Sequence, residues 1–314
     1  MGKIKKGYIP VMLTPFKENG EVDYEGLTKL VDLYLESGVS GLFANCLSSE
    51  MYELDERERL QIVSHVVKAV NGNVPVVATG TFGGTITKQA GFIKRMHDTG
   101  VEAVIVITGL MAGKRESDEV LNDRIFQLLQ STGDIKLGLY ECPVPYKRII
   151  TAEQLKKLVA TNRITYLKDT SLDIEQVKAK LKVISKNAEF GLYDAYIGHA
   201  VESLKAGSAG LSCIQGNFFP ELIIWLCENY DEPLLKNEVE RVQQILKDNM
   251  DVVHDVYPIN AKYFLQKRGL GISTYTRRQV GVFSMEIRMK IDKLYTEFGH
   301  LRKELNIQLA GYPV

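Results

Sequence analysis

The amino-acid sequence predicts an eight-stranded α/β barrel, a (β/α)8 TIM barrel, with a C-terminal helical extension. Short apolar runs rich in Val, Ile and Leu alternate eight times with longer segments of helical periodicity. Such apolar runs are typical of parallel strands buried on both faces. The first run ends in Leu13-Thr14-Pro15-Phe16, which is not the glycine-rich phosphate loop expected in an open doubly wound sheet. The barrel is therefore favoured over the open sheet.

The predicted strands are four to six residues long. They are Tyr8–Leu13, Gly41–Ala44, Val74–Ala78, Ala103–Ile107, Lys136–Tyr140, Ile164–Lys168, Ala188–Leu192 and Gly210–Cys213.

A helix is predicted after each strand. The predicted helices are Tyr24–Ser37, Asp55–Val70, Thr87–Thr99, Asp118–Gln130, Thr151–Val159, Asp173–Ser185, Gly198–Ala206 and Phe219–Asn229. Glycine follows three of them directly, at Gly38, Gly100 and Gly207, where the left-handed backbone that closes a last helical turn favours glycine. Thr151 with Gln154, and Ser171 ahead of Glu175, indicate helix starts.

Residues 1–232 are expected to form the barrel, and residues 233–314 a charged, wholly helical appendage of about three helices packed on it. The 314 residues exceed the usual domain length, but barrels of this kind often do so as one unit.

The composition argues against nucleic-acid and membrane partners. Lys+Arg and Asp+Glu both number 39, so the formal net charge is zero and polyanions exert no general attraction. No apolar run reaches membrane-spanning length, and the N-terminal MGKIKKGYIP lacks the apolar segment of a secretory signal. We expect a cytoplasmic protein.

Neither a disulfide nor a metal centre is expected. The four cysteines, Cys46, Cys142, Cys213 and Cys227, include no CxxC pair, and a cytosolic chain of this size needs no disulfide. A metal-dependent aldolase would need histidines at strand ends, whereas all five lie in predicted helical segments. No glycine-rich loop that would suit a phosphate-binding barrel follows the seventh strand. The sequence thus predicts no metal and no cofactor.

Lys168 is the first candidate for chemistry. In a barrel of this type, functional side chains lie at the carboxyl ends of the strands, and Lys168 ends the sixth strand. Alternation places it on the same face as Ile164 and Tyr166. If that face points inward, burial lowers the pKa of the amine and makes it a nucleophile toward carbonyls. A solvated lysine at a strand end is the alternative.

Tyr140 and the loop after the second strand are the other candidates. Tyr140 ends the fifth strand, next to Lys168 in the expected strand order, and could relay a proton. Alternatively, Tyr140 has only a packing role, with a buried ring and a hydroxyl that contacts solvent. Ser48 and Ser49 offer consecutive hydroxyls as a carboxylate cradle, although an ordinary turn with Glu50 as its structural anchor fits equally well.

Taken together, these motifs resemble those of the dihydrodipicolinate synthase/N-acetylneuraminate lyase family of pyruvate-dependent enzymes. The resemblance extends roughly from Gly7 to Leu270. Its matching pieces are Tyr8-Ile9-Pro10, Leu13-Thr14-Pro15-Phe16, the loop ending in Glu50, Val77-Ala78-Thr79-Gly80-Thr81, Tyr140-Glu141-Cys142-Pro143, Leu167-Lys168-Asp169-Thr170 and Pro258-Ile259-Asn260-Ala261-Lys262.

This resemblance implies a role for each candidate. Lys168 matches the Schiff-base lysine, and Tyr140 matches the tyrosine that donates and accepts protons. Ser48 matches the hydroxyl that binds the carboxylate of the 2-oxo acid, and Ser49 replaces the loop glycine beside it. Ser212, near the end of the eighth strand, falls where a backbone carbonyl lines the pocket.

Three departures concern the second substrate. Leu47 stands where the family has a relay hydroxyl, and the loop containing Met111 lacks the usual tyrosine pair. Pro145 replaces a substrate-binding arginine of the lysine-pathway enzymes, and Arg148 is a candidate to substitute for it. These departures predict a poor dihydrodipicolinate synthase.

The leading hypothesis is a class I aldolase or lyase that forms a Schiff base with pyruvate or a related 2-oxo acid and handles an unidentified aldehyde. The lysine-pathway enzyme 4-hydroxy-tetrahydrodipicolinate synthase, an N-acetylneuraminate lyase and a sugar-acid dehydratase are alternatives. A regulator that binds a 2-oxo acid without catalysis is a further one, but the intact Lys168 and Tyr140 pair argues against it. The resemblance implies a homo-oligomer, a dimer or a tetramer.

Overall fold

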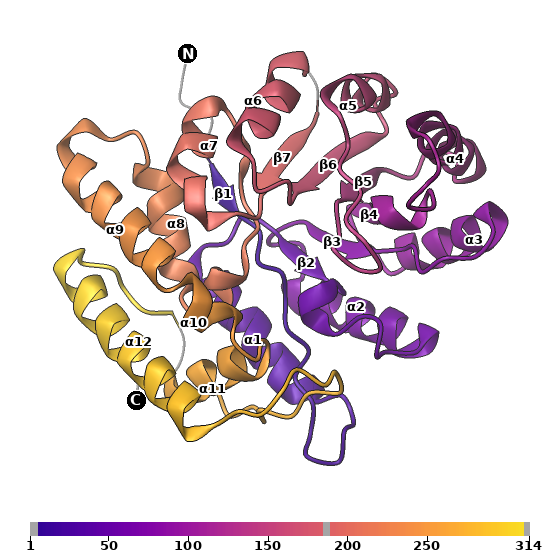
Figure 1. Ribbon diagram of the computed structural model, residues 1–314. Helices are drawn as coiled ribbons and strands as arrows, with labels where there is room; N and C mark the ends of the chain where they lie inside the picture. The colour runs from indigo at the N-terminus through magenta and orange to yellow at the C-terminus, as the bar shows by residue number, and fades with distance from the viewer. Residues whose placement is uncertain (1–5, 185–188, 311–314) are drawn as a thin grey trace.

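The computed structural model describes residues 6–184 and 189–310. It contains one sheet of eight parallel strands in the order β1-β8-β7-β6-β5-β4-β3-β2, with helices packed around the outside (Figure 1). The strands are β1 (Gly7–Tyr8), β2 (Leu42–Ala44), β3 (Val76–Thr79), β4 (Ala103–Ile107), β5 (Leu137–Tyr140), β6 (Ile164–Asp169), β7 (Gly191–Asp194) and β8 (Gly210–Leu211). The predicted barrel is confirmed.

The helices that follow the strands lie close to their predicted positions. They are α1 (Tyr24–Ser37), α2 (Glu56–Val70), α3 (Ile86–His97), α4 (Asp118–Ser131), α5 (Ala152–Val159), α6 (Ile174–Val183), α7 (Ala200–Ala206) and α8 (Pro220–Asn229). Thr151 caps α5 in a capping box with Gln154, as predicted. Helix α6 is capped by Asp173 instead of Ser171, since the Asp173 carboxylate accepts the Glu175 N–H.

The first predicted strand, Tyr8–Leu13, is interrupted. Pro10 lacks an N–H, so the ladder that pairs Gly7 and Tyr8 with β8 stops there. The chain then changes partner, and Val11 forms a parallel bridge with Phe43 of β2. This change brings the two ends of the sheet together and closes the barrel.

The seventh strand runs further than predicted. The start of the range Ala188–Leu192 lies outside the described residues, and β7 continues to Asp194, which pairs with Asp169. Tyr193 stacks on Tyr166 with ring centroids 5.1 Å apart, and the buried Asp194 carboxylate accepts the Tyr196 N–H. The strand therefore ends in polar side chains whose ring contacts and hydrogen bonds are made within the protein. A prediction from apolar periodicity does not include such residues in a strand.

The C-terminal extension is not wholly helical. It contains η5 (Pro233–Leu235), α9 (Lys236–Asp248), α10 (Met250–His254), α11 (Ile259–Lys267) and α12 (Met285–Glu304). Residues 270–284, here called the crossing segment, have no regular secondary structure and run past the barrel between α11 and α12 (Figure 1). The prediction was wrong for this segment because its backbone is held by side chains from the barrel instead of by helical hydrogen bonds.

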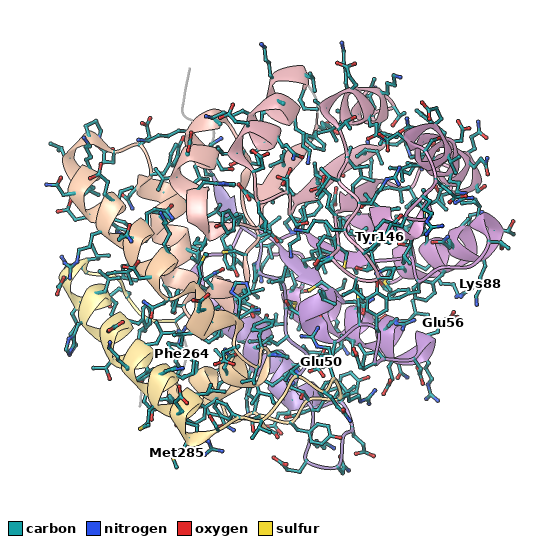
Figure 2. All side chains as sticks on the ribbon, viewed as in Figure 1. Glu50, Glu56, Lys88, Tyr146, Phe264 and Met285 are labelled. Atoms are coloured by element: carbon teal, nitrogen blue, oxygen red, sulfur yellow. The ribbon has the colours of Figure 1, made fainter. Side chains whose placement is uncertain are left out.

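An aromatic cluster and a buried ion pair attach the extension to α8. Phe219 stacks on Phe298 with centroids 5.3 Å apart, and Phe264, which Figure 2 labels beside α12, packs edge-on against Phe219. Arg268 pairs with Glu221, and both side chains are only 4% exposed.

No helix in residues 6–184 or 189–310 is long and apolar enough to cross a bilayer.

Strand alternation separates the barrel interior from the layer beneath the helices. Ala103, Ile105 and Ile107 of β4 belong to an interior cluster that also contains Tyr140 and Tyr166. Val104 and Val106 of the same strand belong to the larger core that includes the helices. Tyr140 and Tyr166 therefore point into the barrel, which is the condition that the sequence analysis set for the face carrying Lys168. Ile164 was expected on that face but belongs to the larger core, because the register between β5 and β6 shifts after Leu137.

A buried ion cluster joins α6 to β5 and β6. The Lys180 Nζ lies 2.6 Å from a carboxylate oxygen of Glu141 and 2.6 Å from one of Asp169. Glu141 also accepts the backbone N–H groups of Ile150 and Thr170. Burial, together with the nearby Asp169 carboxylate, raises the pKa of Glu141 to about 7. Because Glu141 and Asp169 directly follow Tyr140 and Lys168 in the chain, this cluster fixes the two strand ends.

Replacing Lys180 should destabilise the fold strongly. Lys180→Met leaves two buried carboxylates without a counter-ion, and we expect a loss of about 3–5 kcal/mol in the free energy of unfolding at pH 8. The loss should be smaller at pH 5. The raised pKa means that Glu141 is protonated there, so the uncompensated charge is reduced.

Urea unfolding of the variant and of wild type at both pH values measures this effect. Lys178→Met is the matched control, because Lys178 lies on the same helix with its side chain 39% exposed and pairs with Glu175 and Glu202 at the surface. The Lys178→Met substitution should lower the free energy of unfolding by less than about 1 kcal/mol. Equal losses for the two variants would contradict the importance of the buried cluster.

Candidate active site

A cavity of about 260 Å³ opens at the carboxyl ends of the strands. Four of the five predicted site residues line it: Lys168, Tyr140, Ser48 and Ser212. They come from β6, from β5, from the short helix η1 (Leu47–Ser49) after β2, and from the residue after β8. Parallel strands deliver these side chains to one place because their carboxyl ends meet at the same rim.

The Lys168 amine is buried and has no counter-ion. The residue is 4% exposed, and no Asp or Glu of the described residues forms an ion pair with it. Its Nζ lies 4.7 Å from the ring centroid of Tyr140 and 5.9 Å from that of Phe43. Burial lowers the pKa of this amine, which increases the fraction of the neutral, nucleophilic form.

Tyr140 lies directly beside Lys168, since the two residues are register partners in β5 and β6. Its ring packs edge-on against Phe43 with centroids 5.7 Å apart. Burial, followed by the neighbouring thiols of Cys142 and Cys46, raises the pKa of its hydroxyl well above the ordinary value. The hydroxyl therefore stays protonated at neutral pH and is available as a proton donor.

Gly138 provides space between β4 and β6. A Cβ at this position would lie 2.4 Å from Cδ1 of Ile105 and 2.9 Å from the Cβ of Tyr166. A larger residue would push β6 away and displace Lys168.

The two serines of the loop differ in their surroundings. The Ser49 hydroxyl accepts the Cys46 N–H at 2.9 Å and donates to the Met12 carbonyl at 2.7 Å, so it ties the loop to the first strand segment. Ser48 lines the cavity beside Tyr257; burial raises the pKa of the Tyr257 hydroxyl, and the nearby Ser48 hydroxyl partly opposes this rise. Of the two hydroxyls, that of Ser48 belongs to a cavity residue, whereas that of Ser49 is engaged by the backbone.

Ser212 is fully buried and lines the cavity. Its hydroxyl donates to the Ile9 carbonyl at 2.9 Å and accepts from the Tyr166 hydroxyl at 3.4 Å. These bonds hold the residues after β8 against the first strand segment and fix the cavity wall.

Glu50 connects the loop after β2 to the C-terminal extension. One carboxylate oxygen lies 3.0 Å from the Lys262 Nζ, and both side chains are 0% exposed. The other oxygen accepts the backbone N–H groups of Arg277 and Arg278 at 2.7 and 2.9 Å. In Figure 2, Glu50 lies where the crossing segment passes the barrel. The anchoring role considered for Glu50 from the sequence agrees with this arrangement.

The cavity is also lined by Lys147, His254, Tyr257 and Arg278, none of which the sequence analysis proposed as a site residue. Three of them belong to the extension, which the sequence suggested was a peripheral appendage. The matching stretch Pro258–Lys262 was the signal that could have identified it as part of the site, because Tyr257 immediately precedes it.

Arg148 does not occupy the place suggested for it. Its guanidinium pairs with Asp118 at 2.6 Å and donates to the backbone carbonyl of Glu116, and it is not among the residues that line the cavity. Of the departures noted in the sequence, Leu47 does line the cavity, whereas Met111 is fully buried outside it. Within the described residues, no group of three His, Cys, Asp or Glu side chains is arranged to hold a metal ion.

Comparison with known proteins places this geometry in a family. Residues 5–297 match the model of the dihydrodipicolinate synthetase family. A 4-hydroxy-tetrahydrodipicolinate synthase from Marinobacter nauticus is 23% identical over 93% of this chain and 94% of its own length. The enzyme of the same name from Saccharophagus degradans is 27% identical over 84% of this chain and 89% of its own length.

Solved structures share the fold. A monomeric dihydrodipicolinate synthase variant superposes with a TM-score of 0.84 at 22% identity, covering 95% of this chain and 99% of its own. A prophage protein of the dihydrodipicolinic acid synthase family from E. coli K12, solved in complex with pyruvate, gives 0.81 at 21% identity, covering 95% and 98%.

The family match extends over nearly the whole chain, and it includes the strands that carry Lys168 and Tyr140. The chain therefore belongs to the dihydrodipicolinate synthetase family and is a lyase of the class I, Schiff-base type.

Proposed function

We propose that Lys168 forms an imine with pyruvate or a closely related 2-oxo acid and that the enzyme then makes or cleaves a carbon–carbon bond to an aldehyde. The observation that carries this proposal is a buried lysine amine with no counter-ion, placed beside a protonated tyrosine hydroxyl in a cavity. The complex of the related prophage protein with pyruvate supports the choice of 2-oxo acid.

The proposed steps use the residues at the cavity floor. The neutral Lys168 amine attacks the ketone carbon, the resulting carbinolamine loses water, and Tyr140 supplies and recovers the protons that these steps require. Ser48 binds the carboxylate of the 2-oxo acid, and Ser212 holds the opposite wall. Ser49 contributes by fixing the loop. Loss of a proton from the adjacent carbon then gives an enamine, which attacks the aldehyde carbon.

Synthesis of 4-hydroxy-tetrahydrodipicolinate is the second candidate, favoured by the names of the curated relatives. Leu47 argues against it, because an aliphatic side chain in the cavity cannot relay a proton. We further propose that the protein is a homo-oligomer, either a dimer or a tetramer.

Borohydride reduction in the presence of pyruvate should attach a pyruvyl-sized adduct to Lys168. Because burial lowers the pKa of this amine, adduct formation should persist at pH values below the range in which an exposed lysine reacts, and it should rise with pH through the lowered pKa. Intact mass followed by peptide mapping measures both effects.

Lys147→Met is the control, because Lys147 supplies a second amine in the same cavity but donates to the Thr170 carbonyl near its surface. This variant should retain the adduct, whereas Lys168→Met should lose it. An adduct on Lys147, Lys136 or Lys262 would refute the assignment.

Tyr140→Phe should reduce turnover by about a hundredfold or more, since the proton donor is lost while the ring still packs against Phe43. Imine trapping should slow as well, but urea unfolding should change little. Tyr193→Phe is the matched control variant, because Tyr193 of β7 is the register partner of Lys168. If Tyr140→Phe kept full activity, the residue would be reduced to a packing role.

With aspartate semialdehyde as the aldehyde, we expect activity far below the ordinary range for an enzyme of this class. Leu47, which lines the cavity, cannot transfer a proton, and Pro145 removes the substrate-binding cation from the loop after β5. A coupled assay with pyruvate and a panel of aldehydes tests this prediction. Ordinary efficiency with aspartate semialdehyde would show that other cavity groups replace the missing ones.

A further inference from the structure

The backbone of the crossing segment is fixed at the cavity rim. Both Arg277 and Arg278 donate their N–H groups to the buried Glu50 carboxylate. The Arg277 side chain turns to Glu58 and lies 2.6 Å from its carboxylate. These contacts hold position 278 in place, so its side chain reaches the cavity from a rigid base.

The Arg278 guanidinium lacks an acidic partner. It donates from one nitrogen to the Tyr257 carbonyl at 3.0 Å, and it forms no ion pair with any Asp or Glu of the described chain. A guanidinium has five N–H donors in a fixed fork that matches a carboxylate or phosphate. Most of these donors remain available to a ligand in the cavity.

The charge around the cavity is one-sided. The cations Lys147 and Arg278 line it, and no acidic side chain is among the lining residues that the structure describes. In a protein whose formal net charge is zero, this local excess of basic groups attracts anions specifically to the site.

Arg278 and Ser48 mark two separate positions along the wall. The Ser48 hydroxyl lies near enough to the Tyr257 hydroxyl to lower its pKa, whereas Arg278 bonds to the backbone carbonyl of the same residue. The two groups thus approach opposite ends of Tyr257. One anionic group bound at Ser48 leaves Arg278 available for a second one.

We infer that Arg278 determines specificity by binding a second anionic group, a carboxylate or a phosphate, on the aldehyde half of the substrate. This inference rests on the proposed Schiff-base function and extends it to a class of acceptor. In the loop after β5, Pro145 replaces a substrate-binding arginine. Arg278 supplies a cation for the acceptor from the crossing segment instead.

The test uses 2-oxo acids that resemble the addition product, so it requires no knowledge of the natural aldehyde. 2-Oxoadipate carries a distal carboxylate, and 2-oxohexanoate has the same chain length without it. Borohydride trapping on Lys168, measured as the half-saturating concentration of each acid and of pyruvate, reports binding. Wild type should trap 2-oxoadipate at lower concentration than 2-oxohexanoate.

Arg278→Met should raise the half-saturating concentration of 2-oxoadipate by about 10- to 100-fold, while those of 2-oxohexanoate and pyruvate change less than about threefold. Arg278→Lys should recover part of the loss, because it keeps the charge but not the fork. Arg148→Met is the control and should change none of the values, since Arg148 pairs with Asp118 away from the cavity.

The outcomes separate the two proposals. If Arg278→Met weakens all three acids alike, the guanidinium binds the common 2-oxo acid carboxylate and the inference is overturned. It is also overturned if 2-oxoadipate binding does not change. If wild-type protein traps no 2-oxo acid at Lys168, the proposed function is refuted, and the inference that rests on it is refuted as well. A phosphate-bearing aldehyde compared with its dephosphorylated form in the aldol assay then distinguishes the two kinds of anion.

Discussion

The site depends above all on the buried carboxylate of Glu50. This group accepts hydrogen bonds from the Lys262 amine and from two consecutive backbone N–H groups of the crossing segment. Leaving such a carboxylate buried without these partners would cost several kcal/mol, roughly the scale of the whole stability margin of a domain. One side chain thus positions both the loop that carries Ser48 and the segment that carries Arg278.

Three lysines of the described chain that are at most 4% exposed differ in their surroundings. Lys180 and Lys262 each lie against carboxylates that stabilise their charge, whereas Lys168 faces aromatic rings and a cavity. Burial disfavours the ammonium in all three, and carboxylates oppose this effect only for the first two. They raise the pKa of Lys180, whereas burial still lowers that of Lys262. The fold therefore uses ion-paired lysines to connect its segments, whereas Lys168 has no ion pair among the described residues and is available for the proposed attack on a carbonyl.

Periodicity in the sequence was enough to predict the barrel and to place Lys168 and Tyr140 at neighbouring strand ends. Interactions between distant segments were not predictable in this way. The Ser49 hydroxyl bonds to the carbonyl of Met12, 37 residues away, so a local motif could not show that its hydroxyl is already engaged. Arg148 was considered because it is near Pro145 in the chain, yet Arg278, far away in the sequence and in a segment without periodicity, reaches the cavity.

The crossing segment has a consequence for how this enzyme can diversify. Residues 270–284 carry no helical or strand periodicity, and their backbone is held by Glu50 instead of by a regular ladder. Side chains there can change without disturbing the alternation that β5 and β6 need to present Tyr140 and Lys168. Under the proposed assignments, bond-making chemistry and acceptor choice reside on separate parts of one chain, so a lineage can acquire new aldehydes by altering a loop while its strands stay unchanged.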